Sequence, residues 1–319
     1  MKPLSDAAGD SWADLFLLPD RGEYSYFRLA PEAMSAAPNW LSTAALAVDM
    51  SMLSYMRWGD NSMPGEDFRN ILRGFRVQIL RSGDSTGTAG FFASTPDLAF
   101  LVFRGTEHDD FRDLLTDSAF LQVPEPHEPS LLRSIRFQGM RVHLGFQRAL
   151  DSVWDEVATL LADYREVHQR APICFTGHSL GGALASLALS RFPGTGTSLY
   201  TFGAPRVGNG PFCEHLVAKA DLGLYRFVNG NDMVTYGPPT TFGYLHPTVP
   251  MLHIGPTGEI RPAEPPSHSD WSELADFLAA LKPIGSNFDR RIPVPPMLLD
   301  HKPVRYAAPI WDCLERSMR

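Results

Sequence analysis

A short apolar run at 172–176 leads directly into Gly-His-Ser-Leu-Gly at 177–181, and a segment rich in Ala and Leu follows at once. We expect a buried strand, a tight turn and a helix in immediate succession. Such a turn strains the backbone of its middle residue, and flanking glycines avoid side-chain collisions there. The pattern predicts that Ser179 projects above the edge of a sheet as a nucleophile. The alternative, a serine that only caps the helix, does not explain both glycines.

Strand and helix signals alternate on both sides of this turn. Strands are expected over 75–80, 88–94, 98–104, 172–176, 198–202 and 224–228, and helices over 41–57, 145–169, 180–191 and 212–220. Such alternation predicts an α/β fold with a mainly parallel sheet covered by helices on both faces. A hairpin over 249–260, a helix over 269–281, a Pro-rich stretch over 283–296 and a short helix over 307–316 complete the chain. We expect one domain over 1–319, with an irregular N-terminal segment over 1–38.

The charge and the cysteines narrow the functional classes. A formal net charge of -8 disfavours nucleic-acid binding and strong attraction to anionic lipids. The three cysteines, an odd and sparse set, fit reduced thiols better than a disulfide framework. None of them has the paired spacing of a zinc site. We therefore expect neither a metal nor an organic cofactor.

The N-terminal residues show no basic start followed by an apolar stretch, so no signal peptide is visible. The longest weakly charged stretch, 39–56, carries Asp49 near its middle. A central Asp costs about 2.5–3.5 kcal/mol on membrane-insertion scales, so this stretch is interpreted as a buried helix and not as a transmembrane span. We expect a cytoplasmic protein, or one exported without a classical signal peptide.

A serine hydroxyl is a weak nucleophile until a histidine takes its proton and a carboxylate orients that histidine. Asp232 is the strongest candidate acid because it follows an expected strand, where active-site groups of such sheets gather. The alternative is an Asp that only hydrogen-bonds its own turn. Asp221 and Asp270 are weaker candidates, since neither directly follows a strand.

Four histidines come after Asp232 in the chain order that this chemistry uses in such folds. They are His246, His253, His268 and His301. The pattern alone favours His301 only mildly over His246. His178, beside the candidate nucleophile, is interpreted as a packing or supporting residue.

Several motifs resemble the fungal-type lipases of lipase class 3, in family order and over roughly 41–311. They are Phe-Arg-Gly-Thr at 103–106, Val-His-Leu-Gly-Phe at 142–146, the glycine-flanked serine at 177–182, Thr-Phe-Gly-Ala-Pro-Arg-Val-Gly-Asn at 201–209, the segment 229–239 with Asp232, and Asp300-His301 followed by Tyr306. Each motif alone is modest evidence, whereas all of them in order make a specific match. The resemblance implies an α/β-hydrolase fold.

The resemblance also implies roles for matched positions. Ser179, Asp232 and His301 match the catalytic triad, and the backbone N–H of Leu180 would form the oxyanion hole together with Thr106. The segment 108–116 matches a short helical lid that covers the pocket. Its apolar residues Phe111, Leu114 and Leu115 would share one helix face toward substrate. The alternative for this segment is a helix fixed on the core.

The implied activity is hydrolysis of carboxylic esters, with acylglycerols as the leading substrate class and a lipid–water interface as a possible site of action. A feruloyl-type esterase and a phospholipase A1 are alternatives with the same chemistry. A catalytically silent scaffold that binds a partner or ligand is the non-enzyme alternative, because a fold alone does not prove activity. The sequence does not indicate the oligomeric state.

Two features depart from secreted fungal members: neither a signal peptide nor a disulfide set is evident. These departures suggest a bacterial-type member of the family. The Pro-rich stretch before His301 is also long, and no role is assigned to it.

Overall fold

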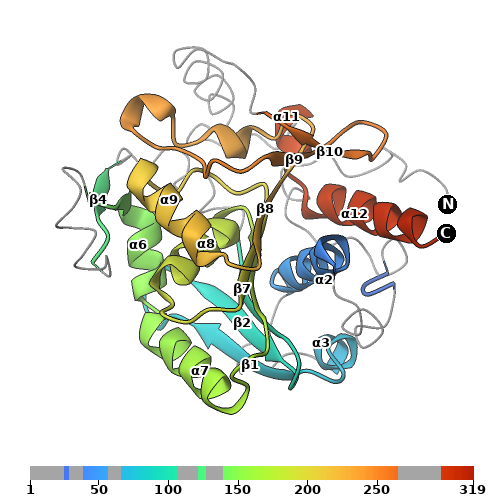
Figure 1. Cartoon of the computed structure of the whole chain (residues 1–319), viewed down its shortest axis with the longest axis horizontal. Helices are drawn as coiled ribbons and strands as arrows, with labels where there is room; N and C mark the ends of the chain where they lie inside the picture. Colours follow the sequence, from blue (N-terminus) through green and yellow to red (C-terminus); the bar gives the residue numbers. More distant parts are fainter. Residues whose placement is uncertain (1–24, 29–38, 57–65, 106–120, 127–138, 265–295) are drawn as a thin grey trace.

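The structure, a computed structural model, describes residues 25–28, 39–56, 66–105, 121–126, 139–264 and 296–319. An eight-stranded sheet in the order β1-β2-β3-β6-β7-β8-β9-β10 organises this part of the chain (Figure 1). Its strands are β1 (Arg76–Arg81), β2 (Ala89–Ser94), β3 (Ala99–Phe103), β6 (Ile173–His178), β7 (Thr197–Phe202), β8 (Gly223–Asn229), β9 (Met251–Ile254) and β10 (Ile260–Ala263). The five strands from β3 to β9 run parallel, and antiparallel pairs complete both edges. The predicted mainly parallel sheet is confirmed.

Helices cover both faces of the sheet (Figure 1). One face carries α2 (Trp40–Leu53) and α12 (Pro303–Ser317), and the other carries α6 (Leu144–Asp151), α7 (Trp154–Val167), α8 (Leu180–Arg191) and α9 (Gly210–Lys219). Successive strand side chains point to opposite faces, so Cys174 of β6 joins the core under α2 and Phe175 joins the core under α8. Burial on both faces explains why the central strands are almost continuously apolar.

The helix α8 is buried along nearly its whole length after Leu180. It packs on β3, β6 and β7 and also contacts α6 and α9, which explains its Ala- and Leu-rich composition without a polar face. The helix α2 begins at a capping box, in which the side chain of Asn39 accepts bonds from Leu41 N and Ser42 N and the hydroxyl of Ser42 accepts from Asn39 N.

Shorter elements connect these layers. They are α3 (Glu66–Ile71), a ribbon of β4 (Gln122–Pro124) and β5 (Arg141–His143), the 3₁₀ turns η2 (Met233–Tyr236) and η3 (Thr240–Phe242), and α11 (Pro296–Leu299). The expected hairpin over 249–260 is present as the antiparallel pair β9–β10. The expected helix over 269–281 and nearly all of the Pro-rich stretch lie outside the described residues.

Two helix predictions need correction. The expected single helix over 145–169 is two helices, because Val153 adopts φ -131° and ψ 1° between them. The hydroxyl of Ser152 donates to the carbonyl of Ala149 and competes with the helical bonding pattern at this point. The final helix is longer than expected and begins at Pro303, a residue that suits the first turn of a helix.

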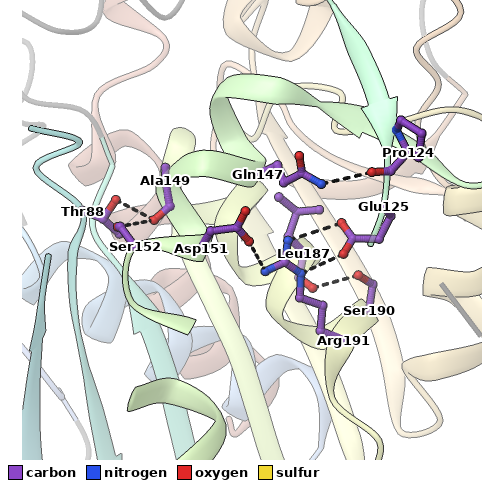
Figure 2. Close-up of polar contacts among 10 residues, drawn as sticks. All are labelled: Thr88, Pro124, Glu125, Gln147, Ala149, Asp151, Ser152, Leu187, Ser190 and Arg191. Atoms are coloured by element: carbon purple, nitrogen blue, oxygen red, sulfur yellow. Dashed lines mark hydrogen bonds and ion pairs between the residues drawn. The ribbon is translucent and has the colours of Figure 1, made fainter. Parts of the chain in front are cut away.

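A buried ion pair ties the β4 segment to the end of α8 (Figure 2). Arg191 Nε donates to Glu125 Oε1 over 2.9 Å, and both side chains are at most 1% exposed. Asp151, which is 47% exposed, accepts a second bond of 2.7 Å from the same guanidinium. The ring of Trp154 lies against this guanidinium, with its centroid 5.3 Å from Cζ. Three segments far apart in the sequence are therefore joined through Arg191.

Among the helices that the structure describes, none is both long and apolar enough to cross a membrane. All three cysteines are free, and burial raises the pKa of Cys174 and Cys213 above the ordinary range of a thiol.

Candidate active site

The turn between β6 and α8 holds Ser179 at φ 58° and ψ -131°, a positive φ that non-glycine residues rarely adopt. The two glycines of the motif are required by close packing. A Cβ on Gly177 would lie 2.2 Å from the carbonyl carbon of Gly181, and a Cβ on Gly181 would lie 2.2 Å from the carbonyl oxygen of Phe103. The predicted strand, tight turn and helix are all present.

The hydroxyl of Ser179 is buried and has no hydrogen-bond partner among the described residues. Leu180 is the first residue of α8, where backbone N–H groups have no partner within the helix. The dipole of a helix favours negative charge at this end. The turn therefore combines the backbone N–H of Leu180, which has no partner within the helix, with a serine hydroxyl that makes no hydrogen bond to a described residue.

Asp232 lies between β8 and η2, at the same edge of the sheet, and it is fully buried. Its Oδ1 accepts the N–H of Val234 over 3.0 Å. Its Oδ2 accepts His301 Nδ1 over 2.7 Å and also the hydroxyl of Tyr306. A buried carboxylate with three donors is held in one orientation.

His301 lies between α11 and α12, and its ring is fully buried. Because Asp232 accepts from Nδ1, this nitrogen carries the proton, and Nε2 is the basic nitrogen of the neutral ring. The other histidines that the structure describes after Asp232 bond elsewhere: Nε2 of His246 donates to the carbonyl of Thr235, and Nε2 of His253 donates to that of Gly230. The structure thus pairs Asp232 with His301. His268 lies outside the described residues.

His178 connects the serine turn to the loop of His301. Its Nε2 donates to the carbonyl oxygen of His301 over 2.7 Å, so its Nδ1 accepts the hydroxyl of Tyr55 over 2.8 Å. The two imidazole rings lie 4.4 Å apart between centroids. Burial, and then the neighbouring His301, hold the pKa of His178 well below its usual range, so this ring stays neutral. The supporting role expected for His178 agrees with these contacts.

Gly203 lies directly after β7 and has φ +61°. A Cβ at this position would lie 2.6 Å from Asp232 Oδ2, 2.9 Å from the Tyr306 hydroxyl and 3.0 Å from His301 Nδ1. Only glycine therefore lets the chain pass this close to the Asp–His pair. Sequence reasoning did not single out Gly203 or Tyr55, although Gly203 lies in the conspicuous run at 201–209.

The remaining predicted residues cannot be placed. Thr106, the expected second oxyanion donor, lies outside the described residues, as does the expected lid over 108–116 with Phe111, Leu114 and Leu115. Within the described part of the chain, no group of three His, Cys, Asp or Glu side chains is arranged to hold a metal ion.

The family profile described as Lipase (class 3) matches residues 100–242, which include most of β3, the serine turn and Asp232. A lipase of Rhizopus niveus is 34% identical over 157 residues, and a secreted mono- and diacylglycerol lipase of Malassezia globosa is 30% identical over 161 residues. Over this part of the chain, the protein is similar to the class 3 lipases. These alignments cover 47% and 48% of this chain, and the chain spans 37% and 51% of the length of these two relatives.

Solved structures extend the family likeness beyond the matched segment. A triacylglycerol lipase whose catalytic centre is described as a serine protease triad has a TM-score of 0.55 and 26% identity, covering 67% of this chain and 80% of that one. A mono- and diacylglycerol lipase from Aspergillus oryzae has the same score and identity, covering 72% and 82%. The predicted α/β-hydrolase fold is confirmed. The bacterial-type origin stays a prediction.

Proposed function

We propose that this chain is a member of the class 3 lipase family and a serine ester hydrolase, with Ser179 as nucleophile, His301 as general base and Asp232 as the carboxylate that orients it. The observation that carries the proposal is the buried 2.7 Å bond between His301 Nδ1 and Asp232 Oδ2 beside a strained serine turn. This bond sets the tautomer in which Nε2 can accept a proton. In acyl transfer, a buried Asp of this kind orients the histidine and stabilises the imidazolium that forms when the histidine takes the serine proton.

The reaction proceeds in two halves. Ser179 Oγ attacks the ester carbonyl carbon while its proton passes to His301 Nε2, and Asp232 stabilises the imidazolium that forms. The tetrahedral intermediate collapses as His301 gives the proton to the leaving alcohol. Water then attacks the acyl-enzyme, with His301 again taking and returning a proton, and the carboxylic acid leaves.

The oxyanion that forms in each half needs donors aimed at it before the reaction starts. The backbone N–H of Leu180, at the start of α8, is suited to this role. Thr106 is proposed as the second donor by its family match, and 108–116 as the lid that excludes water. Loss of one oxyanion donor typically costs about 2.7–4 kcal/mol of transition-state stabilisation.

Acylglycerols are the proposed substrate class, because the similar proteins carry names of triacylglycerol, diacylglycerol and monoacylglycerol lipases. A series of p-nitrophenyl and glycerol esters of increasing chain length, measured below and above their solubility, tests this choice. A jump in rate above the solubility limit supports a mobile lid and action at a lipid surface. A preference for feruloyl esters or for phospholipids would replace acylglycerols and leave the chemistry unchanged.

A fluorophosphonate probe tests the nucleophile without any assumption about the substrate. The wild type should be labelled at Ser179, and Ser179→Ala should lose labelling together with about 10⁴- to 10⁶-fold in kcat on p-nitrophenyl butyrate. His301→Ala should lose comparable activity, whereas His246→Ala, the matched histidine variant, should keep most of it. Labelling that survives in Ser179→Ala would assign the nucleophile to another residue. A folded wild type that is not labelled would replace the proposal with the scaffold alternative.

A further inference from the structure

A buried arginine outside the candidate active site has no counter-charge among the residues that the structure describes. Arg226 lies on β8, paired in register with Thr201 of β7 and Met251 of β9, and it is only 6% exposed. It points to the sheet face that α8 and α9 cover, the same face as Leu224 two residues earlier. Its side chain makes no hydrogen bond and no ion pair with another described residue, and its nitrogens are not among the fully enclosed unpaired atoms.

A buried and unpaired charge is one of the most costly features that a folded protein can carry. Arg226 does not avoid this cost by losing its proton. Burial, and then the nearby Arg206, lower its pKa to about 10, which leaves it charged at neutral pH. The nearby thiol of Cys213 supplies no negative charge, because burial raises the pKa of Cys213 to about 12.

Within the described part of the chain, the basic group that acts on Arg226 is a second arginine, Arg206. Arg206 is itself buried and donates to the carbonyls of Tyr236 and Pro238. His246 donates through Nε2 to Thr235, and burial, Arg226 and Arg206 together hold its pKa well below the usual range. Burial is the largest cause of this lowered pKa, and the two arginines lower it further.

Arg226 lines a cavity of about 20 Å³ between the sheet, α8 and α9. Ser186 and Thr201 supply hydroxyls to its wall, and Cys213 and His246 also border it. A cavity needs roughly 10–15 Å³ on this measure to hold one water molecule, so there is room for one particle of about that size. Phosphate, sulfate and larger carboxylates do not fit.

We propose that this cavity is a binding site for one small monovalent anion of the size of chloride, with Arg226 as its counter-charge. The anion would neutralise the buried guanidinium and lower the repulsion between Arg226 and Arg206. It would thereby stabilise the contact between β8, α9 and the loop that follows β7. This site is independent of the proposed ester hydrolysis, so failure of one proposal leaves the other in place.

Thermal unfolding in graded chloride tests the proposal. Ionic strength is held constant with sodium gluconate, whose anion is too large for the cavity. The Tm of the wild type should rise saturably, by roughly 2–4 °C at about five times the dissociation constant of chloride. Arg226→Met should lose this response. Arg261→Met, the matched variant at an arginine of β10 whose side chain is 76% exposed, should keep it.

Bromide can locate the anion in the wild-type protein directly, so this second test does not require that a variant folds. In crystals of the wild type grown with sodium bromide, an anomalous peak should lie within hydrogen-bonding distance of the Arg226 guanidinium. A cavity that holds only water, a carboxylate of this chain in contact with Arg226, or a chloride response that persists in Arg226→Met would each overturn the proposal.

Discussion

Substitution of Gly203 by alanine tests the geometry of the Asp–His pair without removing any of its polar groups. The new methyl would lie 2.6 Å from Asp232 Oδ2 and 3.0 Å from His301 Nδ1, closer than real contacts of this kind. The carboxylate or the imidazole must therefore move. A misplacement of about 1 Å can cost about 10²-fold, and loss of the correct tautomer about 10⁴-fold. We expect kcat on p-nitrophenyl butyrate to fall by about 10²- to 10⁴-fold, with KM changed by less than about threefold.

Gly196→Ala is the matched control for backbone strain. Gly196 also has a positive φ, of +72°, but a Cβ there would meet nothing closer than the guanidinium of Arg165 at 3.7 Å. Both variants should lose about 1–2 kcal/mol of unfolding free energy from the left-handed conformation, measured by urea denaturation. Only Gly203→Ala should lose activity. Equal activity in the two variants would refute the argument that the loop after β7 sets the position of the Asp–His pair.

Three further perturbations follow from contacts described above. Glu125→Gln removes the buried negative charge that pairs with Arg191 and should cost about 3–5 kcal/mol of unfolding free energy. Asp151→Asn, at the exposed end of the same cluster, should cost less than about 1 kcal/mol. Equal losses for the two variants in urea denaturation would contradict this reasoning. Because the pKa of His178 is lowered in the folded protein, below about pH 6.5 this imidazole binds a proton in the unfolded chain but stays neutral in the folded one. The contribution of this group to the unfolding free energy is therefore complete above pH 6.5, and it decreases by up to about 1.4 kcal/mol for each pH unit below that value. In denaturation curves from pH 4.5 to 7, His178→Asn should remove this contribution to the pH dependence of the unfolding free energy. Asp300→Ala removes the carboxylate that accepts the backbone N–H of Asn231, the residue before the candidate acid. Steady-state kinetics should show kcat reduced about tenfold with KM nearly constant. An unchanged kcat would show that the loops of Asp232 and His301 hold their positions without this bond.

Local patterns along the chain were sufficient for the parts of the fold that depend on neighbouring residues. The strand, turn and helix around Ser179 were predicted because steric limits at one tight bend select glycine on both sides. The parallel sheet was predicted from alternating periodicity alone. The break at Val153 was missed because the apolar stripe continues across it, and a stripe does not show where the backbone leaves helical angles.

Contacts between distant segments were harder to predict. Patterns in the chain left His246 and His301 as near-equal candidates, and only the family resemblance favoured the residue that contacts Asp232 in the structure. The bond between Tyr55 and His178 joins residues 123 positions apart, and no local signal marks either end of it. That Arg226 has no partner among the described residues is equally invisible in sequence, because it depends on which strands lie beside β8.

The position of His301 late in the chain has a consequence for biosynthesis. The serine turn and Asp232 belong to segments that leave the ribosome well before the imidazole that is proposed to act on them. The C-terminal helix that follows His301 supplies Tyr306 to Asp232 and inserts Trp311 into the core under α2. A nascent chain that has not yet reached residue 301 therefore holds the proposed acid and nucleophile without the proposed base, and we expect ester hydrolysis only after α12 packs on α2 and β8.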